Sequence, residues 1–153
     1  IDRLGDPFAL AGFHSNTRHD VRYHHIKGFG EAWGSESKAR LAAVRGQYST
    51  RMGAALRHAA HYLGAQEADK KLMLVLTDGR PSDIDVPDES ALGVDTRQAV
   101  RELAQMGIYT HCVSLDSQAD DYVNDIFGSS ASVVDRVAVL PERLTRLFVS
   151  LTR

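Results

Sequence analysis

The chain has 153 residues, of which 43% are hydrophobic and 25% are charged. This composition is typical of one globular domain with its own core. The net charge of −2 argues against nucleic acid or an anionic membrane as a general partner, and no apolar run is long enough to span a bilayer. Cys112 is the only cysteine, so an internal disulfide is excluded. This fits a cytoplasmic protein, in which Cys112 is expected to be a small buried hydrophobe.

The first third of the chain predicts two strands and a helix. Residues 8–13 form a short apolar run, and residues 22–29 mix β-formers with His and Lys as an edge strand does. A helix is expected over 35–44, with Leu41 and Val44 turned inward.

The next helix is expected to take Ser49 or Thr50 as its N-cap and to end near Gly64. Its apolar residues recur at helical spacing: Met52, Ala55, Leu56, Ala59 and Leu63. A strand buried on both faces is predicted over 71–76, because that run is continuously apolar.

A polar loop over 80–90 leads to a further amphipathic helix that ends near Gly107, with an apolar stripe of Val94, Ala99, Val100, Leu103 and Met106. The remaining pattern predicts a buried strand over 108–115, a short helix over 122–127 and a last strand over 132–139.

Pro141 suits the first turn of a final helix, whose inner face would carry Leu144, Leu147, Phe148 and Leu151. Strands that alternate with helices indicate an α/β fold with a doubly wound, mostly parallel sheet and helices on both faces.

The strand over 71–76 is followed by Thr77-Asp78-Gly79, and Gly79 and Pro81 prevent it from continuing. Asp78 is therefore expected at the carboxyl end of a central strand, where open α/β sheets bind ligands. This position alone leaves three roles open: a metal ligand, a catalytic acid or base, or a cap for the next turn.

Thr50 is expected at a loop-to-helix junction on the same edge of the sheet. A hydroxyl and a carboxylate that converge there are hard oxygen ligands suited to Mg²⁺. Five neighbours of this pair are candidates for contact with a partner protein, and solvated surface is the alternative for Arg51, Arg80 and the two acids; the five are Ser49, Arg51, Arg80, Asp83 and Asp85.

Histidines suggest a second metal site, because His58 and His61 lie three residues apart on a predicted helix and others crowd the first part of the chain: His14, His19, His24 and His25. No cysteine or acidic residue completes a recognisable spacing for a transition metal. We expect these histidines to be exposed or to lie on an edge strand.

The order of these motifs resembles the von Willebrand factor A (VWA) domain. In that family a metal site is built from Asp-x-Ser-x-Ser, then a Thr with Gly three residues later, then an Asp in Thr-Asp-Gly. The second part matches Thr50 with Gly53, and the third matches Asp78. No Asp-x-Ser-x-Ser occurs in the sequence, and its place would lie before Ile1. The resemblance therefore implies a single VWA-type domain over 1–153, truncated at its N-terminus and lacking the first, central strand. Mg²⁺ binding by the two remaining ligands would be weak or absent.

Longer stretches resemble the C-terminal domain of the NorD/CbbO group: LTDGRPSDIDV, GVDTRQAVRELAQMGIY and GDPFALAGFHSNTRHDVRYHHIKGF. Members of this group work with MoxR-type AAA+ ATPases. The likeness leans toward CbbO, the adaptor of the CbbQ–CbbO Rubisco activase, and the alternative is NorD, which is linked to maturation of nitric oxide reductase. The resemblance implies a non-catalytic adaptor that captures a client carboxylate through Mg²⁺ held by Thr50 and Asp78.

An enzymatic alternative is a Mg²⁺-dependent hydrolase that uses Asp78 as ligand or nucleophile, because doubly wound folds host such enzymes. It needs further acids at neighbouring strand ends, and Asp116 is the clear candidate. The sequence has no Gly-rich phosphate loop, nucleophile elbow or dinucleotide fingerprint. Any ATPase activity is therefore expected in a partner.

Overall fold

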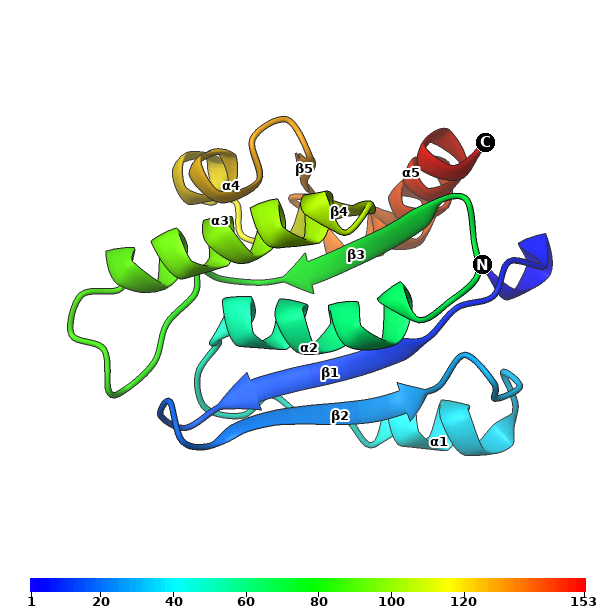
Figure 1. Ribbon diagram of the computed structural model, residues 1–153, viewed down its shortest axis with the longest axis horizontal. Coiled ribbons are helices and arrows are strands. Elements are labelled where there is room, and N and C mark those ends of the chain that lie inside the picture. Colours follow the sequence, from blue (N-terminus) through cyan, green and yellow to red (C-terminus); the bar gives the residue numbers. More distant parts are fainter.

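The computed structural model describes residues 1–153 except for the side chain of Asp120. Helices and strands alternate along most of the chain (Figure 1), as the sequence predicts. The order is β1 (Leu10–Ser15), β2 (Val21–Lys27), α1 (Ser35–Ala42), α2 (Met52–Gly64), β3 (Lys71–Thr77), α3 (Ser90–Gln105), β4 (Ile108–Ser114), α4 (Asp120–Phe127), β5 (Ala131–Val133) and α5 (Leu140–Thr152). Short 3-10 turns lie at Asp2–Leu4 and Val137–Val139.

The strands form two sheets. β3, β4 and β5 are parallel, with β4 in the middle, and Lys71 is paired with Ile108 and Thr77 with Ser114. β1 and β2 form an antiparallel hairpin. The two sheets are not hydrogen-bonded to each other in the described structure, so the overall sheet is interrupted between β1 and β3, where the resemblance places a further strand. β1 and β3 run in the same direction (Figure 1).

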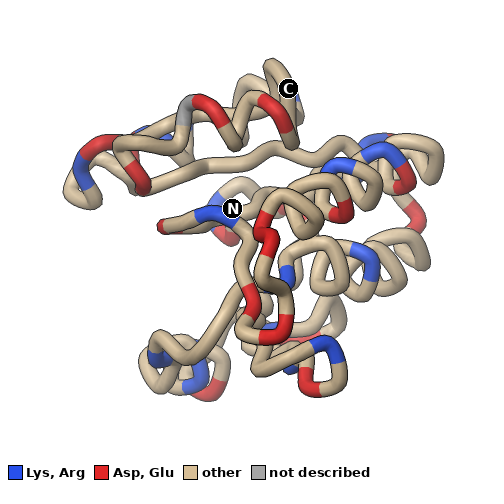
Figure 2. Tube along the Cα trace, turned by 90° about the vertical axis from the view of Figure 1, so that its left-hand side faces the viewer, with Lys and Arg blue, Asp and Glu red and all other residues tan. Residues whose placement is uncertain are grey.

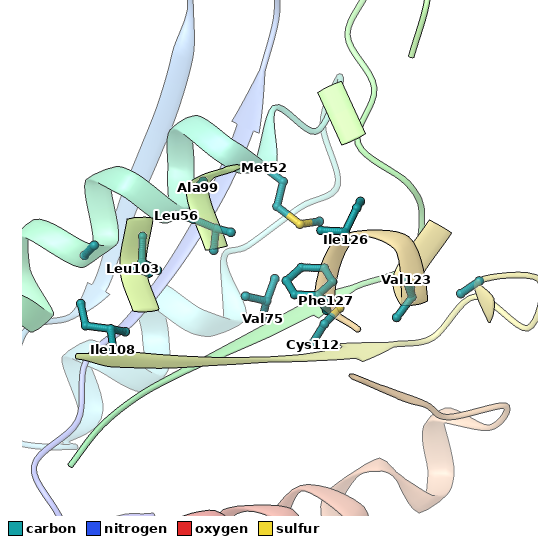
Figure 3. Packing of buried hydrophobic residues seen from close by; sticks show 12 residues of the cluster. Met52, Leu56, Val75, Ala99, Leu103, Ile108, Cys112, Val123, Ile126 and Phe127 are labelled. Atoms are coloured by element: carbon teal, nitrogen blue, oxygen red, sulfur yellow. The ribbon is translucent and has the colours of Figure 1, made fainter. Parts of the chain in front are cut away.

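The core lies between the three-stranded sheet and α2, α3 and α4 (Figure 3). Parallel strands need crossover helices, and those helices cover the sheet with their apolar stripes. The cluster includes Met52, Leu56, Val75, Ala99, Leu103, Ile108, Val123, Ile126 and Phe127. Cys112 is fully buried in this cluster, as its apolar surroundings in the sequence predict. α5 lies across the sheet from the cluster, so helices flank both faces.

Helices α2 and α3 pack closely because α2 has a glycine at their contact and charged side chains of the two helices pair at its edge. A Cβ atom at Gly53 would collide with Oδ2 of Asp95. Arg57 on α2 donates from Nη1 to Oδ1 of Asp95 at 2.9 Å and from Nε to Oε2 of Glu102 at 2.7 Å. Gly53, the residue three positions after Thr50, therefore has a packing role in this fold.

Several sequence expectations about burial are wrong. Leu41 and Val44 are exposed, at 42% and 48%, because only a small part of α1 packs on β2. Val94 and Met106 are exposed too. Ala99 and Leu103 of the expected stripe are buried as predicted, and Leu92 and Thr96 complete the buried face of α3. Burial of β3 on both faces is incomplete, because Leu76 is 46% exposed on the side away from α2 and α3.

Three element boundaries also differ from the expectation. The first strand begins at Leu10 and continues to Ser15, because pairing with β2 extends into residues predicted as loop. The last predicted strand, 132–139, is a strand only up to Val133 and then turns into a 3-10 helix. Neither Ser49 nor Thr50 is the N-cap of α2; Arg51 occupies that position without a side-chain cap.

Charges of both signs are mixed along the helices and loops (Figure 2), in keeping with the small net charge. Among the described residues, no helix combines the length and the hydropathy that a membrane crossing requires.

Candidate functional site

The candidate site lies at the carboxyl ends of the strands, where the tips of β1 and β3 and the first turn of α2 are on the same side of the molecule (Figure 1). β3 ends at Thr77, whose hydroxyl donates to the carbonyl of Gly79 at 2.7 Å. This bond turns the chain sharply after the strand. Asp78 lies within this turn and is exposed, so its carboxylate is accessible from solvent.

Thr50 is held by its backbone between two other loops. Ser49 exchanges hydrogen bonds with Ser15 at the end of β1, at 2.8 and 2.9 Å. Thr50 does the same with Ser82 in the loop after β3, at 2.9 and 3.1 Å. These backbone hydrogen bonds bring Thr50 beside the loop that carries Asp78. They also explain why the chain is still extended at Ser49 and Thr50, the positions expected to cap α2.

A group of four charged side chains, Arg18, Arg51, Asp83 and Asp85, ties the same three loops together; we call it the loop clamp. Arg51 donates from Nε to Oδ2 of Asp83 at 3.0 Å and from Nη2 to Oδ1 of Asp85 at 2.5 Å. Arg18 donates to Oδ2 of Asp85 from both its amide and Nε, each at 2.9 Å. Three residues proposed for partner contact, Arg51, Asp83 and Asp85, are therefore paired with one another.

The side chain of Asp83 is completely buried, yet it is well supplied with donors. Its Oδ1 accepts from the amides of Thr17 and Ile84, each at 2.8 Å. Burial alone would raise the pKa of Asp83, but hydrogen bonds from Ser15, Thr17, Arg51 and Ile84 outweigh it and hold the pKa below its ordinary value. Asp83 thus stays charged inside the clamp.

Asp85 is the outer carboxylate of the clamp. The amide and the guanidinium of Arg18 lower the pKa of Asp85 to about 2. Both acids of the clamp are therefore ionised at neutral pH, and both are neutralised locally by arginine.

Arg80 follows Asp78 by two residues and has a different environment from the clamp. Its guanidinium carbon is 5.3 Å from the ring centroid of Tyr122 on α4, a cation–π distance. The Tyr122 hydroxyl is 3.4 Å from Oγ of Ser114 at the end of β4. Burial is the first cause that raises the pKa of Tyr122, so the ring stays neutral beneath the guanidinium.

Asp116, the second acid of the hydrolase alternative, is used in a local turn. Its Oδ1 accepts from the amide of Gln118 at 2.9 Å, and its own amide donates to Oγ of Ser114 at 3.2 Å. This is the pattern of a turn-stabilising carboxylate.

The residues present fit part of a Mg²⁺ site. Thr50 supplies a hydroxyl and Asp78 a carboxylate, and both are hard oxygen donors of the kind that Mg²⁺ takes. Among the described side chains, no three His, Cys, Asp or Glu residues gather closely enough to hold a metal ion. The donor set described here therefore covers two positions of a shell that needs about six oxygens.

Five of the seven histidines form two groups on the two faces of the hairpin. His14 and His24 are stacked, with Nδ1 of His14 3.2 Å from Nε2 of His24. Burial, followed by the nearby His24 and Arg22, lowers the pKa of His14. On the other face, aromatic rings of β2 and α2 pack edge to face around Tyr62. The surrounding rings are those of Tyr23, His25, His58 and His61.

Ser15, Thr17 and Tyr122 contribute to the site although the sequence analysis did not select them. Ser15 accepts from the Arg51 amide through its hydroxyl at 3.1 Å, and Thr17 supplies an amide to Asp83. A polar Ser-Asn-Thr run directly after a strand could have drawn attention to the first two. Tyr122 had no comparable signal, since an aromatic residue on a short helix ordinarily faces the core.

Comparison with known proteins identifies the class. The family description "von Willebrand factor type A domain" matches residues 1–144, and the chain belongs to this family. It is 43% identical over its whole length to an uncharacterized protein of Pseudomonas aeruginosa. It is also 43% identical to Protein NorD of Stutzerimonas stutzeri over 85% of the chain, and 36% identical to Protein NorD of Brucella melitensis over 97%.

The chain spans about a quarter of the length of these relatives, at 25%, 21% and 24% respectively. No solved structure matches the chain. The family is therefore established at the level of the domain.

Proposed function

We propose that this domain is a metal-dependent protein-binding module that captures a carboxylate of a client protein. The observation that carries the proposal is the placement of Asp78, which is exposed at the carboxyl end of β3 beside the clamped loop of Thr50. In this proposal Thr50 and Asp78 hold Mg²⁺ together with ligands beyond the described residues. The ion supplies positive charge and an open coordination position for the client's carboxylate.

The five neighbouring residues have two roles in this proposal. Ser49 and the clamp residues Arg51, Asp83 and Asp85 give the rim its shape, because their backbone or side chains join one loop to another. Arg80 is directed at the client. A rigid rim around a metal-held carboxylate provides selectivity, since loops that are already ordered lose little entropy when a partner binds.

The adaptor role draws support from the VWA family match and from relatives named NorD. We propose that the module works in the cytoplasm with a MoxR-type AAA+ ATPase, which would supply the force that remodels the client. The resemblance to CbbO suggests Rubisco as the client. Nitric oxide reductase is the alternative, and the shared name of the relatives leaves the choice between the two open.

Replacement of Asp78 by alanine in the full-length natural protein tests the metal-dependent role. We expect the variant to lose Mg²⁺-dependent client capture while its thermal unfolding stays unchanged, because an exposed carboxylate contributes little to stability. Capture is measured by calorimetry with purified Rubisco and, separately, with nitric oxide reductase, each with and without Mg²⁺.

Asp116→Ala is the matched control, because this residue is also an acid at a strand end. It should retain capture. Unchanged client binding by Asp78→Ala would contradict the proposal. Turnover of a generic phosphoester that is lost in both variants would instead favour the hydrolase alternative, which needs the two acids together.

A further inference from the structure

Two arginines flank the candidate site, and the structure gives them different surroundings. Arg51 has a side-chain exposure of 15% and is engaged by two carboxylates of the loop clamp. Arg80 is exposed, and among the described side chains no carboxylate lies within ion-pair distance of it. Among the described side chains, carboxylates thus neutralise the positive charge of Arg51, and none pairs with the exposed Arg80.

The position of Arg80 is fixed by an aromatic ring. Its guanidinium lies over Tyr122 at 5.3 Å, and Tyr122 is held near the end of β4 through Ser114. Ser114 pairs with Thr77, the residue before Asp78. Asp78 therefore follows the end of β3, and the Arg80 guanidinium lies over a ring at the end of the neighbouring strand, β4. A guanidinium stacked on a ring keeps its edge free, and that edge can bind a carboxylate through two parallel hydrogen bonds.

We infer that the domain recognises a client segment with two carboxylates, one bound at the Thr50–Asp78 metal site and the second bound by Arg80 on its Tyr122 platform. This inference rests on the proposed function, because the first carboxylate defines the site. Tyr122 acts as a positioning residue that restricts the motion of Arg80. Arg51 does not contact the client, and acts through the loop clamp.

A second carboxylate within reach of Arg80 should strengthen binding by about tenfold, which is what one well-placed charge-assisted contact of about 1.4 kcal/mol provides. This gain should disappear when Arg80 is replaced. The affinity for Mg²⁺ and for a segment with one carboxylate should remain.

The test uses capped synthetic peptides of equal length, so that only side-chain carboxylates are present. One peptide contains a single Glu, and three others contain a second Glu placed one, two or three residues after the first. Binding to the full-length natural protein is followed by NMR titration in saturating Mg²⁺. The variants are Arg80→Ala, Arg80→Lys, Tyr122→Leu, Tyr122→Phe and Asp78→Ala. Arg101→Ala is the control, an exposed arginine on α3.

We expect at least one two-Glu peptide to bind about tenfold more tightly than the one-Glu peptide. Arg80→Ala should erase this difference, and Arg80→Lys should restore part of it, because lysine keeps the charge without the planar fork. Tyr122→Phe should preserve most of the difference, since the ring remains although its contact with Ser114 is lost, whereas Tyr122→Leu should reduce it further. Arg101→Ala should change nothing.

The outcomes separate this inference from the proposed function. Equal binding of all peptides to the unmodified protein, or a preference that survives Arg80→Ala, overturns the role of Arg80 alone, provided that Asp78→Ala abolishes binding. Binding that persists in Asp78→Ala overturns the proposed function. No Mg²⁺-dependent binding of any peptide to the unmodified protein contradicts both.

Discussion

Asp83 is the residue on which the geometry of the site depends most directly. Its side chain is completely buried, and its two oxygens accept from Thr17, Ile84 and Arg51. These donors come from three different loops. A buried carboxylate is costly unless its charge and its lone pairs are satisfied. The charge and the lone pairs of Asp83 are both satisfied. A residue that would destabilise an apolar core therefore fixes the loops around Thr50 and Asp78.

Replacement of Asp83 by asparagine is expected to lower the free energy of unfolding by about 2–4 kcal/mol. Asparagine keeps the shape of the side chain, but it removes the charge that balances Arg51 and turns an amide donor toward a guanidinium donor. Urea denaturation measures the loss.

Asp88→Asn provides the comparison for Asp83→Asn, since Asp88 is an exposed acid in the same loop and its side chain accepts only a local bond from Ser90. Its loss of stability should be clearly smaller than that of Asp83→Asn. Equal stability of the two variants would show that the clamp contributes nothing to the fold.

The sequence predicted single residues of the site better than their connections. Asp78 could be placed because a strand that stops at Gly79 must present its last acid at the edge of the sheet. The link from Asp83 to Thr17 joins residues 66 positions apart, and the link to Arg51 spans 32 positions. No local pattern encodes such pairing, so Asp83 could be noticed as an acid near the site but not as a buried one.

At the level of elements, α3 separates two apolar residues that periodicity placed on one stripe. Leu103 is 1% exposed and Met106 is 52% exposed. Leu103→Ala should therefore lower the free energy of unfolding by about 2–5 kcal/mol through transfer and cavity terms. Met106→Ala should cost less than about 1 kcal/mol. Guanidinium denaturation of both variants checks the difference, and a comparable loss in both would contradict the observed burial of Leu103 and exposure of Met106 at the C-cap of α3.

The elements themselves were predictable wherever an apolar run had one explanation. β3, β4, α2 and α5 lie close to their predicted positions, because continuous runs favour buried parallel strands and periodic runs favour helices. The error at 134–139 has a different origin. A valine-rich run favours strand locally, but the register with β4 ends at Val133. The Val134 amide makes a last hydrogen bond, to the Ser114 carbonyl, and no strand pairing is described for the residues after it. Tertiary context decides such segments, and a single sequence does not contain it.

For the molecule as a whole, two buried histidines predict how stability depends on pH. Burial lowers the pKa of His111, and burial together with His24 and Arg22 lowers the pKa of His14, both from 6.5. The unfolded chain therefore takes up these protons at a higher pH than the folded chain. Stability should be complete above pH 6.5 and fall as the pH drops through that value toward the lowered pKa values.

Thermal unfolding between about pH 8 and pH 5 measures this dependence, and we expect the midpoint to fall by about 2–6 °C. The carboxylates of the loop clamp keep their charge in this range, because their pKa values are lowered from 3.8. His111→Gln should flatten the dependence by removing one of the two groups. An unfolding midpoint that is constant across the range would contradict the assignment of buried, neutral histidines.

The interruption between β1 and β3 divides the molecule into parts that need not open together. Each β4 amide lies in a strand with partners on one or both sides, so exposing it to solvent requires the three-stranded sheet to come apart. The hairpin of β1 and β2 is hydrogen-bonded within itself. It is joined to the rest by packing on α2, by the backbone hydrogen bonds between Ser15 and Ser49, and by the loop clamp. Fluctuations that release these contacts can therefore free the hairpin as a unit. The domain thus has two local unfolding steps. The step with the lower free energy opens the loops that would meet a client.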